Sequence, residues 1–337
     1  MSILFVTGGA GFIGSNFIRY WLTRHPDGRI VNYDMLTYAG NLASLDDVVA
    51  RFGARYRFVQ GDIANGELLA HLLAEERPDA VVNFAAESHN SRAVHDPGIF
   101  FRTNVLGTQT LLEAARSAGG IRVHHISTCE VYGDLALDSR ERFTESSPYR
   151  PRTPYNASKA AADMAVRAYF ETFGLPITIS NCANNYGPYQ FPEKVIPYFT
   201  VLALRAKPLT LYQASKNRRE WLHVEDHCRA IELILEKGRI GEIYNIGSGI
   251  EADVEAIADL VLATLGLPSS QKTYVPDRPG HDRRYLLDAG KIMRELGWQP
   301  QIPFDSGMRQ TILWYKAHPE WWQPLVERLA VDEARWK

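Results

Sequence analysis

Apolar and polar positions follow two different rhythms along the first half of the chain. Short apolar runs predict strands at residues 2–7, 30–33, 56–60, 80–84, 121–126 and 177–180. Between several of these runs, apolar residues recur at the helical spacing, which predicts helices that end near residue 22 and span residues 67–76, 100–118 and 155–174. Strands that alternate with helices of this length form parallel sheets with helices on both faces. We therefore predict an α/β fold built on a doubly wound parallel sheet.

The pattern changes after residue 180. Residues 181–197 are rich in Asn, Pro, Tyr and Gly, which predicts a loop rather than a core element. Helices are expected at residues 195–204, 225–236 and 254–265, with a short strand at residues 243–246. We expect residues 1–180 to form one domain and residues 181–330 a smaller mixed α/β substrate-binding domain, with residues 220–247 returning to pack on the first sheet. Trp314, Trp321 and Trp322 are expected to be packing residues.

A glycine-rich turn follows the first predicted strand, with Gly8, Gly11 and Gly14 three residues apart. The first glycine allows a tight turn, the second lets the backbone approach a pyrophosphate, and the third lets the helix pack on the strand. The anion is then held at the positive end of the helix. The second strand ends in Asp34, where a carboxylate binds a ribose and repels a 2′-phosphate. We therefore predict a Rossmann-type domain that binds NAD rather than NADP.

Further cofactor contacts are expected in this turn, after the third and fourth strands, and on the helix that follows. These residues are Phe12, Ile13, Asp62, Ile63, Ala85, Ala86 and Thr103.

A tyrosine and a lysine lie four residues apart on the predicted helix at residues 155–174. Tyr155 and Lys159 therefore share one face, about one turn apart. An ammonium beside a phenol favours the phenolate and lowers its pKa, so Tyr155 could take a proton from an alcohol while an oxidant takes the hydride. Thr128 follows a buried strand, at the carboxyl end where open α/β sheets bind ligands, and could donate a hydrogen bond to the same oxygen.

Composition excludes several classes of protein. The formal net charge is −2 and 45% of the residues are hydrophobic, so no overall basic excess indicates a nucleic-acid partner. No apolar run approaches the roughly 20 residues needed to cross a bilayer, and no leader segment is expected. The three cysteines, Cys129, Cys182 and Cys228, have no metal-ligand spacing. A cytoplasmic protein without a metal site fits best.

Cationic residues in the second half could form a second anion site. Lys194, Arg219, Arg278 and His281 are separated in sequence, but each lies in a predicted loop or at the start of an element. If they converge, they suit a nucleotide diphosphate. Asn217 belongs to the same basic run as Arg219. The alternative is solvated surface charge.

Longer motifs narrow the assignment. The glycine turn, Asp34 and the Tyr155–Lys159 pair together resemble an extended short-chain dehydrogenase/reductase. The segments at residues 36–41 (LTYAGN), 85–89 (AAESH), 184–194 (NNYGPYQFPEK) and 276–282 (PDRPGHD) resemble the dTDP-glucose 4,6-dehydratase family. The resemblance runs over nearly the whole chain.

The resemblance implies a reaction and a set of site residues. In that family NAD oxidises a hexose at C4, a glutamate removes the C5 proton, an aspartic acid protonates the leaving C6 hydroxyl, and NADH returns the hydride to C6. The family's Thr-Asp-Glu trio falls on Thr128, Cys129 and Glu130. The resemblance also implies a small-molecule nucleotide-sugar substrate and a homodimer. Substrate contacts are expected at Ser88, His89, Asn184, Asn185, Lys194, Asn217, Arg219, Arg278 and His281.

Three positions depart from the family pattern. The catalytic aspartic acid is replaced by Cys129, the usual Val-Asp after Glu-Ser-His is Asn90-Ser91, and a Gly-Asp-Gly is Gln213-Ala214-Ser215. A thiol is protonated at neutral pH and can donate a proton, although it is a poor hydrogen-bond donor. Cys129 could also simply fill space, with water or Glu130 supplying the acid. These changes concern the product more than the fold.

Other functions remain open. A 5,6-dehydratase would return the hydride to C4 and leave an exocyclic alkene, on a nucleotide sugar or a nucleoside in antibiotic biosynthesis, and such relatives resemble this chain in carrying a cysteine at position 129. Epimerases and decarboxylases of the superfamily also begin by C4 oxidation, but Glu130 as a C5 base favours elimination. Retention of Thr128, Glu130, Tyr155 and Lys159 argues against a non-catalytic NAD-binding regulator.

Overall fold

A parallel sheet forms the centre of the protein. The structure, a computed structural model, describes residues 2–213, 215–277 and 282–326. Within these residues the main sheet has seven strands in the order β10-β6-β5-β4-β1-β2-β3, and every neighbouring pair is parallel. The strands are β1 (Ile3–Thr7), β2 (Arg29–Asp34), β3 (Tyr56–Gln60), β4 (Ala80–Asn83), β5 (Arg122–Thr128), β6 (Ile177–Cys182) and β10 (Ile243–Ile246).

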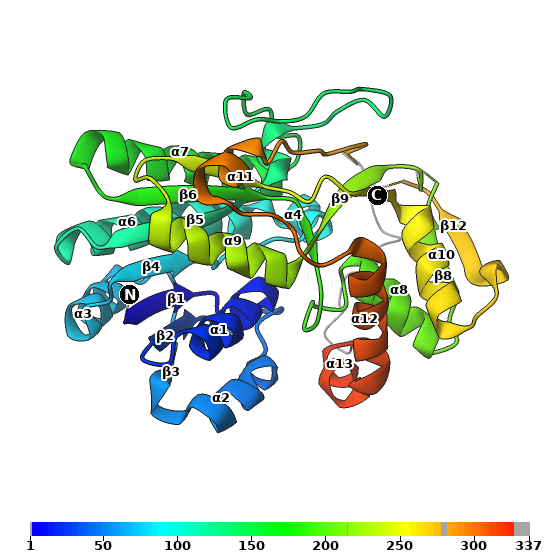
Figure 1. Ribbon diagram of the computed structural model, residues 1–337, viewed down its shortest axis with the longest axis horizontal. Coiled ribbons are helices and arrows are strands. Elements are labelled where there is room, and N and C mark those ends of the chain that lie inside the picture. Colours follow the sequence, from blue (N-terminus) through cyan, green and yellow to red (C-terminus); the bar gives the residue numbers. More distant parts are fainter. Residues whose placement is uncertain (1, 214, 278–281, 327–337) are drawn as a thin grey trace.

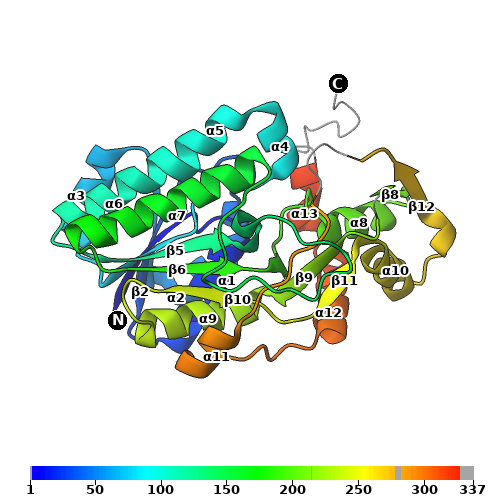
Figure 2. The ribbon, with the colours of Figure 1, turned by 90° about the horizontal axis from the view of Figure 1, so that it is seen from above.

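Helices cover both faces of this sheet (Figure 2). One layer contains α3 (Gly66–Glu76), α6 (Thr108–Ser117) and α7 (Pro154–Phe173). The other contains α1 (Phe12–Arg24), α9 (Val224–Lys237) and α11 (Gly290–Leu296), with α2 (Asp46–Phe52) beside them. Alternate strand residues face the two layers, so Phe5 and Val81 belong to one core and Leu4 and Val82 to the other. The predicted doubly wound parallel sheet is confirmed.

The strand order reverses at β1, and this reversal opens a crevice. The chain runs outward from β1 to β2 and β3 on one side, then crosses to β4, β5 and β6 on the other. Ligands of open α/β sheets bind at this point, outside the carboxyl ends of the strands. The turn at residues 8–11, the segment at residues 84–88 and the end of β5 therefore lie around one crevice.

The helix predicted at residues 100–118 is present but is not regular. It consists of α5 (Pro97–Phe101), a π-helical turn at Arg102–Gly107, and α6. Asn104 in the π turn is buried, and its side chain bonds the backbone of Glu87 at 2.9 and 3.0 Å and Ser158 Oγ at 2.8 Å. Single π turns often occur at functional sites. This one joins α5–α6 to the segment after β4 and to α7.

The second half forms a smaller mixed α/β region (Figure 1). One small sheet has the order β11-β9-β7, with β7–β9 parallel and β9–β11 antiparallel, and β8 pairs with β12. These strands are β7 (Asn184–Tyr186), β8 (Leu209–Tyr212), β9 (Arg218–His223), β11 (Glu251–Asp253) and β12 (Lys272–Val275). The helices packed with them are α8 (Val195–Leu204), α10 (Val254–Leu265) and α12 (Phe304–Ala317).

The prediction of a loop over residues 181–197 is wrong in part. Asn181 and Cys182 complete β6, and residues 184–186 form β7 against β9. Two of the asparagines that suggested a loop, Asn181 and Asn185, are buried and have partners from distant segments, as in the 2.9 Å contact between Asn185 Oδ1 and His227 Nδ1. Local composition could not show that a strand more than thirty residues later supplies the pairing.

Residues 220–247 divide between the two regions. β9 lies in the smaller sheet, α9 covers the main sheet beside α1, and β10 is its edge strand beside β6. At the other end of the described chain, Trp321 and Trp322 in α13 (Pro319–Val326) are buried with Tyr315 and Phe191, and Trp314 packs against them. The expectation of packing is confirmed. None of the helices in the described ranges has the length and apolarity of a membrane span.

Candidate active site

The glycine turn has the close contacts that its sequence indicated. Gly8 has φ +68°, and a Cβ there would lie 2.5 Å from Ala85 N. A Cβ on Gly14 would lie 2.5 Å from Gly8 O, so α1 packs directly on the turn. Gly11 caps α1 without a side-chain hydrogen bond, so no side chain of its own competes for the first N–H groups of the helix. The turn is therefore shaped to receive an anionic ligand at the start of α1.

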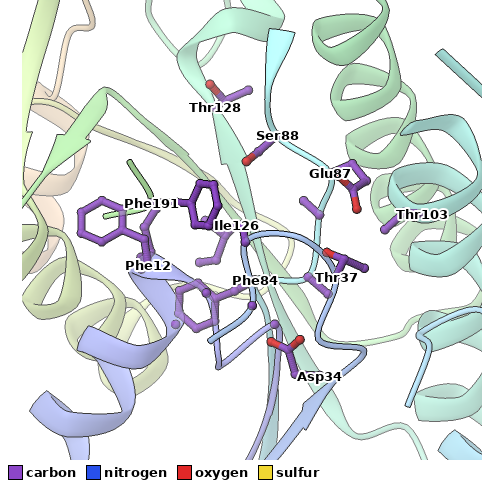
Figure 3. A pocket seen from close by; sticks show the side chains of 18 of the residues that line it. Phe12, Asp34, Thr37, Phe84, Glu87, Ser88, Thr103, Ile126, Thr128 and Phe191 are labelled. Atoms are coloured by element: carbon purple, nitrogen blue, oxygen red, sulfur yellow. The ribbon is translucent and has the colours of Figure 1, made fainter. Parts of the chain in front are cut away.

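Asp34 is held in one orientation at the end of β2. Its carboxylate accepts hydrogen bonds from Ala10 N and Leu36 N, both at 2.8 Å. Burial raises the pKa of Asp34, and these two hydrogen bonds oppose the rise. The carboxylate lines the same crevice as the glycine turn, where a ribose hydroxyl could bind it (Figure 3).

The other expected cofactor residues gather around this crevice, which we call the cofactor cavity. Its lining includes Gly8, Gly11, Phe12, Ile13, Gly14, Asp34, Asp62, Ile63, Ala85, Ala86 and Thr103. Figure 3 shows Asp34 at one end and Thr128 at the other, with Thr103 on one side and Phe12 opposite. Glycines where a Cβ would clash, an anchored carboxylate and the start of a helix fit the pyrophosphate and ribose of a dinucleotide.

The expected catalytic groups lie at the Thr128 end of the cofactor cavity. Thr128, Glu130, Tyr155 and Lys159 all line it. Thr128 ends β5 and caps a short 3₁₀ helix, η4 (Cys129–Tyr132), by accepting from Glu130 N at 3.3 Å. Thr153 caps α7, and Pro154 occupies its first turn. These two caps fix where the strand end and the helix present their side chains.

The expected effect of Lys159 on the phenol differs from what the structure shows. Burial raises the pKa of Tyr155 well above its ordinary value, Glu130 and Cys182 add to the rise, and a hydrogen bond with Thr128 opposes it. Lys159 Nζ donates to Ile126 O at 2.7 Å, and burial lowers the pKa of its ammonium. Burial is the largest of these influences, so the phenol stays protonated.

A buried polar network lies behind Lys159. His125 Nε2 is 3.2 Å from Lys159 Nζ and 3.4 Å from Asp163 Oδ1, and Ser127 Oγ donates to Asp163 Oδ2 at 2.7 Å. Burial lowers the pKa of His125 to about 4, so the imidazole is neutral at physiological pH. The sequence analysis missed this network, although polar residues inside the apolar β5 run were a signal of it.

Glu130 is surrounded by charges of both signs. Burial raises the pKa of Glu130, and Asp282 raises it further. A hydrogen bond from Asn90, and the charges of Arg219 and Lys194, lower it. Glu130 also lines a second cavity, so it stands where the two cavities meet.

The second cavity, which we call the substrate cavity, adjoins the first and contains most of the expected substrate residues. Ser88, His89, Asn184, Asn185, Lys194 and Arg219 line it. Lys194 Nζ donates to Ser88 O at 2.8 Å, and Arg219 Nη2 donates to Asp282 O at 2.7 Å. Buried Asn184 Oδ1 has no hydrogen-bond partner within the described ranges. The cavity therefore combines cationic side chains with unused hydrogen-bonding capacity.

Some expected site residues are not brought into either cavity. Cys129 is 1% exposed, belongs to an apolar cluster with Val131 and Ala160, and lines neither cavity as the described residues define them. Burial raises the pKa of its thiol well above the ordinary value, with Glu130 and Cys182 adding to the rise. Asn217 is buried immediately before β9 and also lies outside both linings. Arg278 and His281 lie outside the described residues.

One carboxylate that the sequence analysis did not choose lines both cavities. Glu193 Oε1 accepts from Tyr38 OH at 2.7 Å, and its Oε2 accepts from Arg92 Nε at 3.2 Å. The sequence offered one indication that Glu193 belongs to the site, because it lies next to Lys194 in the motif at residues 184–194. Tyr285 and Trp221 also line the substrate cavity and were not chosen, although Trp221 follows Arg219 by two residues.

Comparison with known proteins agrees with this architecture. The model of the GDP-mannose 4,6 dehydratase family matches residues 5–311. The dTDP-glucose 4,6-dehydratase of Mycobacterium tuberculosis is 48% identical over 335 residues, which cover 99% of this chain and 98% of that protein. The dTDP-glucose 4,6-dehydratase of Xanthomonas campestris is 47% identical over 345 residues, with 97% of each chain covered.

A solved structure of a relative has a similar fold. The dTDP-glucose 4,6-dehydratase of Streptomyces venezuelae, crystallised with NAD, is 49% identical and superposes with a TM-score of 0.92 over 96% of this chain and 99% of its own. The resemblance found in the sequence motifs is thereby confirmed. The chain belongs to the dTDP-glucose 4,6-dehydratase family, within the group that the GDP-mannose 4,6 dehydratase model describes.

Proposed function

We propose that the protein is an NAD-dependent dehydratase of a nucleotide-activated hexose, a hydro-lyase that recycles its cofactor. The observation that carries this proposal is the place of Glu130. This carboxylate lines both the cofactor cavity and the substrate cavity, in the same lining as Thr128, Tyr155 and Lys159. A carboxylate at that junction is suited to remove a proton from the carbon next to an oxidised centre. The relatives' shared name makes dTDP-glucose the first substrate to test.

The residues of the cofactor cavity would hold NAD. The glycine turn and the start of α1 would bind the pyrophosphate, Asp34 the adenosine ribose, and Asp62 and Ile63 the adenine edge. When bound, NAD would supply the oxidant for C4 of the sugar. Ala85, Ala86 and Thr103 leave room for it along the wall of the cavity.

Tyr155 and Thr128 would handle the proton of the C4 hydroxyl. Because burial raises the pKa of the phenol, Tyr155 needs nearby positive charge before it can act as a base. Lys159 supplies part of that charge from the next turn of α7, and its bond to Ile126 O holds the ammonium in place. The same burial makes the phenolate a strong base once it forms.

Glu130 would then take the C5 proton, which is acidic because it lies next to the new C4 carbonyl. A carboxylate whose pKa is raised by burial is a better proton acceptor than an exposed one. Lys194 and Arg219 would bind the diphosphate of the nucleotide, because their cationic groups line the substrate cavity. Ser88, His89, Asn184 and Asn185 would bind the hexose, because they line the same cavity. The resemblance adds Arg278 and His281 to the proposed anion site.

We also propose that Cys129, which stands where the resemblance places an aspartic acid, is a packing residue. Its side chain is buried in an apolar cluster, so a thiol at this position is poorly placed to protonate the C6 hydroxyl. Glu130, holding the proton taken from C5, or water would supply that proton. Without a carboxylic acid to hold the C6 end, a 5,6-ene formed by reduction at C4 is the second candidate product.

Deuterium at C4 of dTDP-glucose tests the function and the product together. The reaction of a 4,6-dehydratase carries the label to C6 of a 4-keto-6-deoxy sugar, whereas a 5,6-dehydratase leaves it at C4 of an alkene. Mass spectrometry and NMR of the product distinguish the two. If the NAD-loaded protein converts neither dTDP-glucose nor a panel of other nucleotide hexoses, the proposed function is wrong.

The proposed assembly is a homodimer. Phe101 and Leu106, on the α5 and π-helical segment, and Met164 on the adjoining α7 are 42%, 59% and 48% exposed. Large apolar side chains on neighbouring helices are suited to pack against a second copy. Sedimentation should show a dimer that Leu106→Glu weakens, and a monomeric native protein would contradict the proposal.

A further inference from the structure

The side chain of Asn90 bridges the proposed C5 base and the helix that carries Tyr155. Asn90 is the first residue of α4 (Asn90–His95). Its Nδ2 donates to Glu130 Oε2 at 2.9 Å, and its Oδ1 accepts from Thr153 Oγ1 at 2.6 Å. Thr153 in turn caps α7, in which Tyr155 is the second residue. One chain of hydrogen bonds therefore connects Glu130 with the start of the Tyr155 helix.

The direction of each bond in this chain follows from the cap. Thr153 Oγ1 accepts from Asn156 N at 3.2 Å, so the proton of the hydroxyl is available to donate. Its acceptor is the carbonyl oxygen of the Asn90 amide. The amide nitrogen of Asn90 then faces Glu130 and donates to its carboxylate. The cap of α7 thus determines which end of Asn90 meets the base.

We propose that Asn90 is a positioning residue, which holds the Glu130 carboxylate in one orientation at the junction of the two cavities and keeps it ready to accept the C5 proton. This inference rests on the proposed function, since it assigns Glu130 the role of base. A hydrogen bond to a carboxylate stabilises its charged form and fixes its orientation. An apolar side chain at position 90 could do neither.

The charges around Glu130 explain why such a donor matters. Burial and Asp282 favour the protonated carboxyl, whereas Arg219, Lys194 and Asn90 favour the carboxylate. The neighbouring acidic groups, Tyr155, Tyr285, Cys129 and Cys182, are each made harder to ionise by Glu130 and contribute no positive charge. Arg219 and Lys194 would be shared with the anionic substrate. Of the three groups that favour the carboxylate, Asn90 is the only uncharged one. Its hydrogen bond to Glu130 therefore need not be shared with the diphosphate.

Two substitutions of similar size separate the hydrogen bond from the packing. Asn90→Leu keeps the branched shape of the side chain and loses the donor. Asn90→Asp keeps the acceptor for Thr153 but sets a second carboxylate against Glu130. We measure the rate of C5 solvent-deuterium incorporation during turnover of dTDP-glucose by the NAD-loaded protein, from pH 5 to 9. The acid limb of this pH–rate profile should move to higher pH in the order native, Asn90→Leu, Asn90→Asp. At low pH, Asn90→Leu should be roughly tenfold slower than the native protein, and higher pH should restore its rate.

Two further variants serve as controls. Thr153→Ser keeps the hydroxyl and should retain the native profile. Asn65→Leu removes the cap of α3 at a residue that lines neither cavity in the described ranges, and it should lower stability without moving the acid limb. If the Asn90 variants lose the same fraction of activity at every pH, Asn90 is merely structural and the proposal is overturned.

A second readout does not require turnover. Infrared titration of the NAD-loaded protein, with Glu130→Gln to assign the carboxyl band, should show Glu130 protonating at a higher pH in Asn90→Leu and higher again in Asn90→Asp. An unmoved band contradicts the role of Asn90 even if the enzyme is active. If the native protein turns over no nucleotide hexose but the Asn90 variants still show the shifted band, the proposed function is contradicted and the role of Asn90 in orienting Glu130 is not.

Discussion

Tyr155 shows how burial and a neighbouring charge compete at a single residue. Its spacing from Lys159 suggested an acidic phenol, yet in the folded chain desolvation is the larger effect and raises the pKa. Lys159 bonds a backbone carbonyl, and its own ammonium is destabilised by burial. The phenol of such a buried pair stays protonated. Positive charge brought by a bound cofactor can shift it towards the phenolate.

Tyr155→Phe should abolish oxidation at C4 while NAD stays bound. The variant loses the acceptor of the hydroxyl proton but none of the groups around the pyrophosphate and ribose. We expect the rate to fall by roughly 100-fold or more. Turnover and the NAD content of the purified protein check this. Tyr169→Phe, on the same helix but outside both cavity linings of the described residues, is the matched control. Native turnover by Tyr155→Phe would remove Tyr155 from the mechanism.

Glu130→Gln should allow C4 oxidation but stop the exchange of C5 with solvent. The amide keeps the shape of the side chain and cannot accept a proton at neutral pH. We expect reduced cofactor to accumulate, which absorbs at about 340 nm. Deuterium from the solvent should not enter C5. Exchange at the native rate would show that another group is the base.

Among the elements, the turn between β1 and α1 is tightly constrained by backbone contacts. At Gly14 a Cβ would meet Gly8 O at 2.5 Å and Gly9 Cα at 2.7 Å, and both are backbone atoms. Backbone cannot move aside as a flexible side chain does. Any side chain here must push α1 away from the turn that would hold the pyrophosphate.

Gly14→Ala should therefore weaken NAD binding by roughly tenfold or more and lower stability by about 1–3 kcal/mol. Calorimetric titration with NAD and denaturant unfolding measure the two effects. Gly266→Ala is the control, because this glycine has φ +71° with nothing near its Cβ position. It should lower stability through backbone strain and leave NAD affinity unchanged. Equal NAD affinities in the two variants would contradict the packing argument.

At the scale of the whole molecule, one buried carboxylate joins three segments. Glu220 in β9 is 1% exposed and accepts hydrogen bonds from Gly249 N at 2.6 Å and Leu287 N at 2.9 Å. Burial raises the pKa of Glu220 to about 7, although these two bonds oppose the rise. The folded chain therefore keeps a proton on this group at pH values where the unfolded chain has released it.

Stability should consequently fall as pH rises between about 4.5 and 7, and this contribution should be constant above 7. In that window the unfolded state binds fewer protons than the folded state, so a higher pH favours unfolding, by on the order of 3 kcal/mol in total. Free energies of unfolding from urea titrations at pH 5, 6, 7 and 8 test this. Glu220→Gln should be less stable at pH 5, because its amide cannot accept both bonds, but should have a flatter pH slope. An identical slope would show that Glu220 does not titrate in this range.

Features that depend on nearby residues could be predicted from the sequence. The apolar runs predicted the main parallel strands, and the glycine spacing with Asp34 predicted the turn and the carboxylate that line one cavity. Strand alternation, helical periodicity and turn chemistry act over a few residues, so one segment contains the whole signal. The same holds for Thr128, Glu130, Tyr155 and Lys159, because each lies at the end of β5 or the start of α7.

The tertiary structure decided whatever depends on distant partners. It paired β7 with β9, buried Cys129 away from both cavities, and joined Asn90 to Glu130 and Thr153 across forty and sixty-three residues of chain. It also set the pKa values of Tyr155 and Glu130. The physical reason is that burial, strand pairing and the direction of a hydrogen bond depend on which groups fold against a residue, and local periodicity carries no record of those groups.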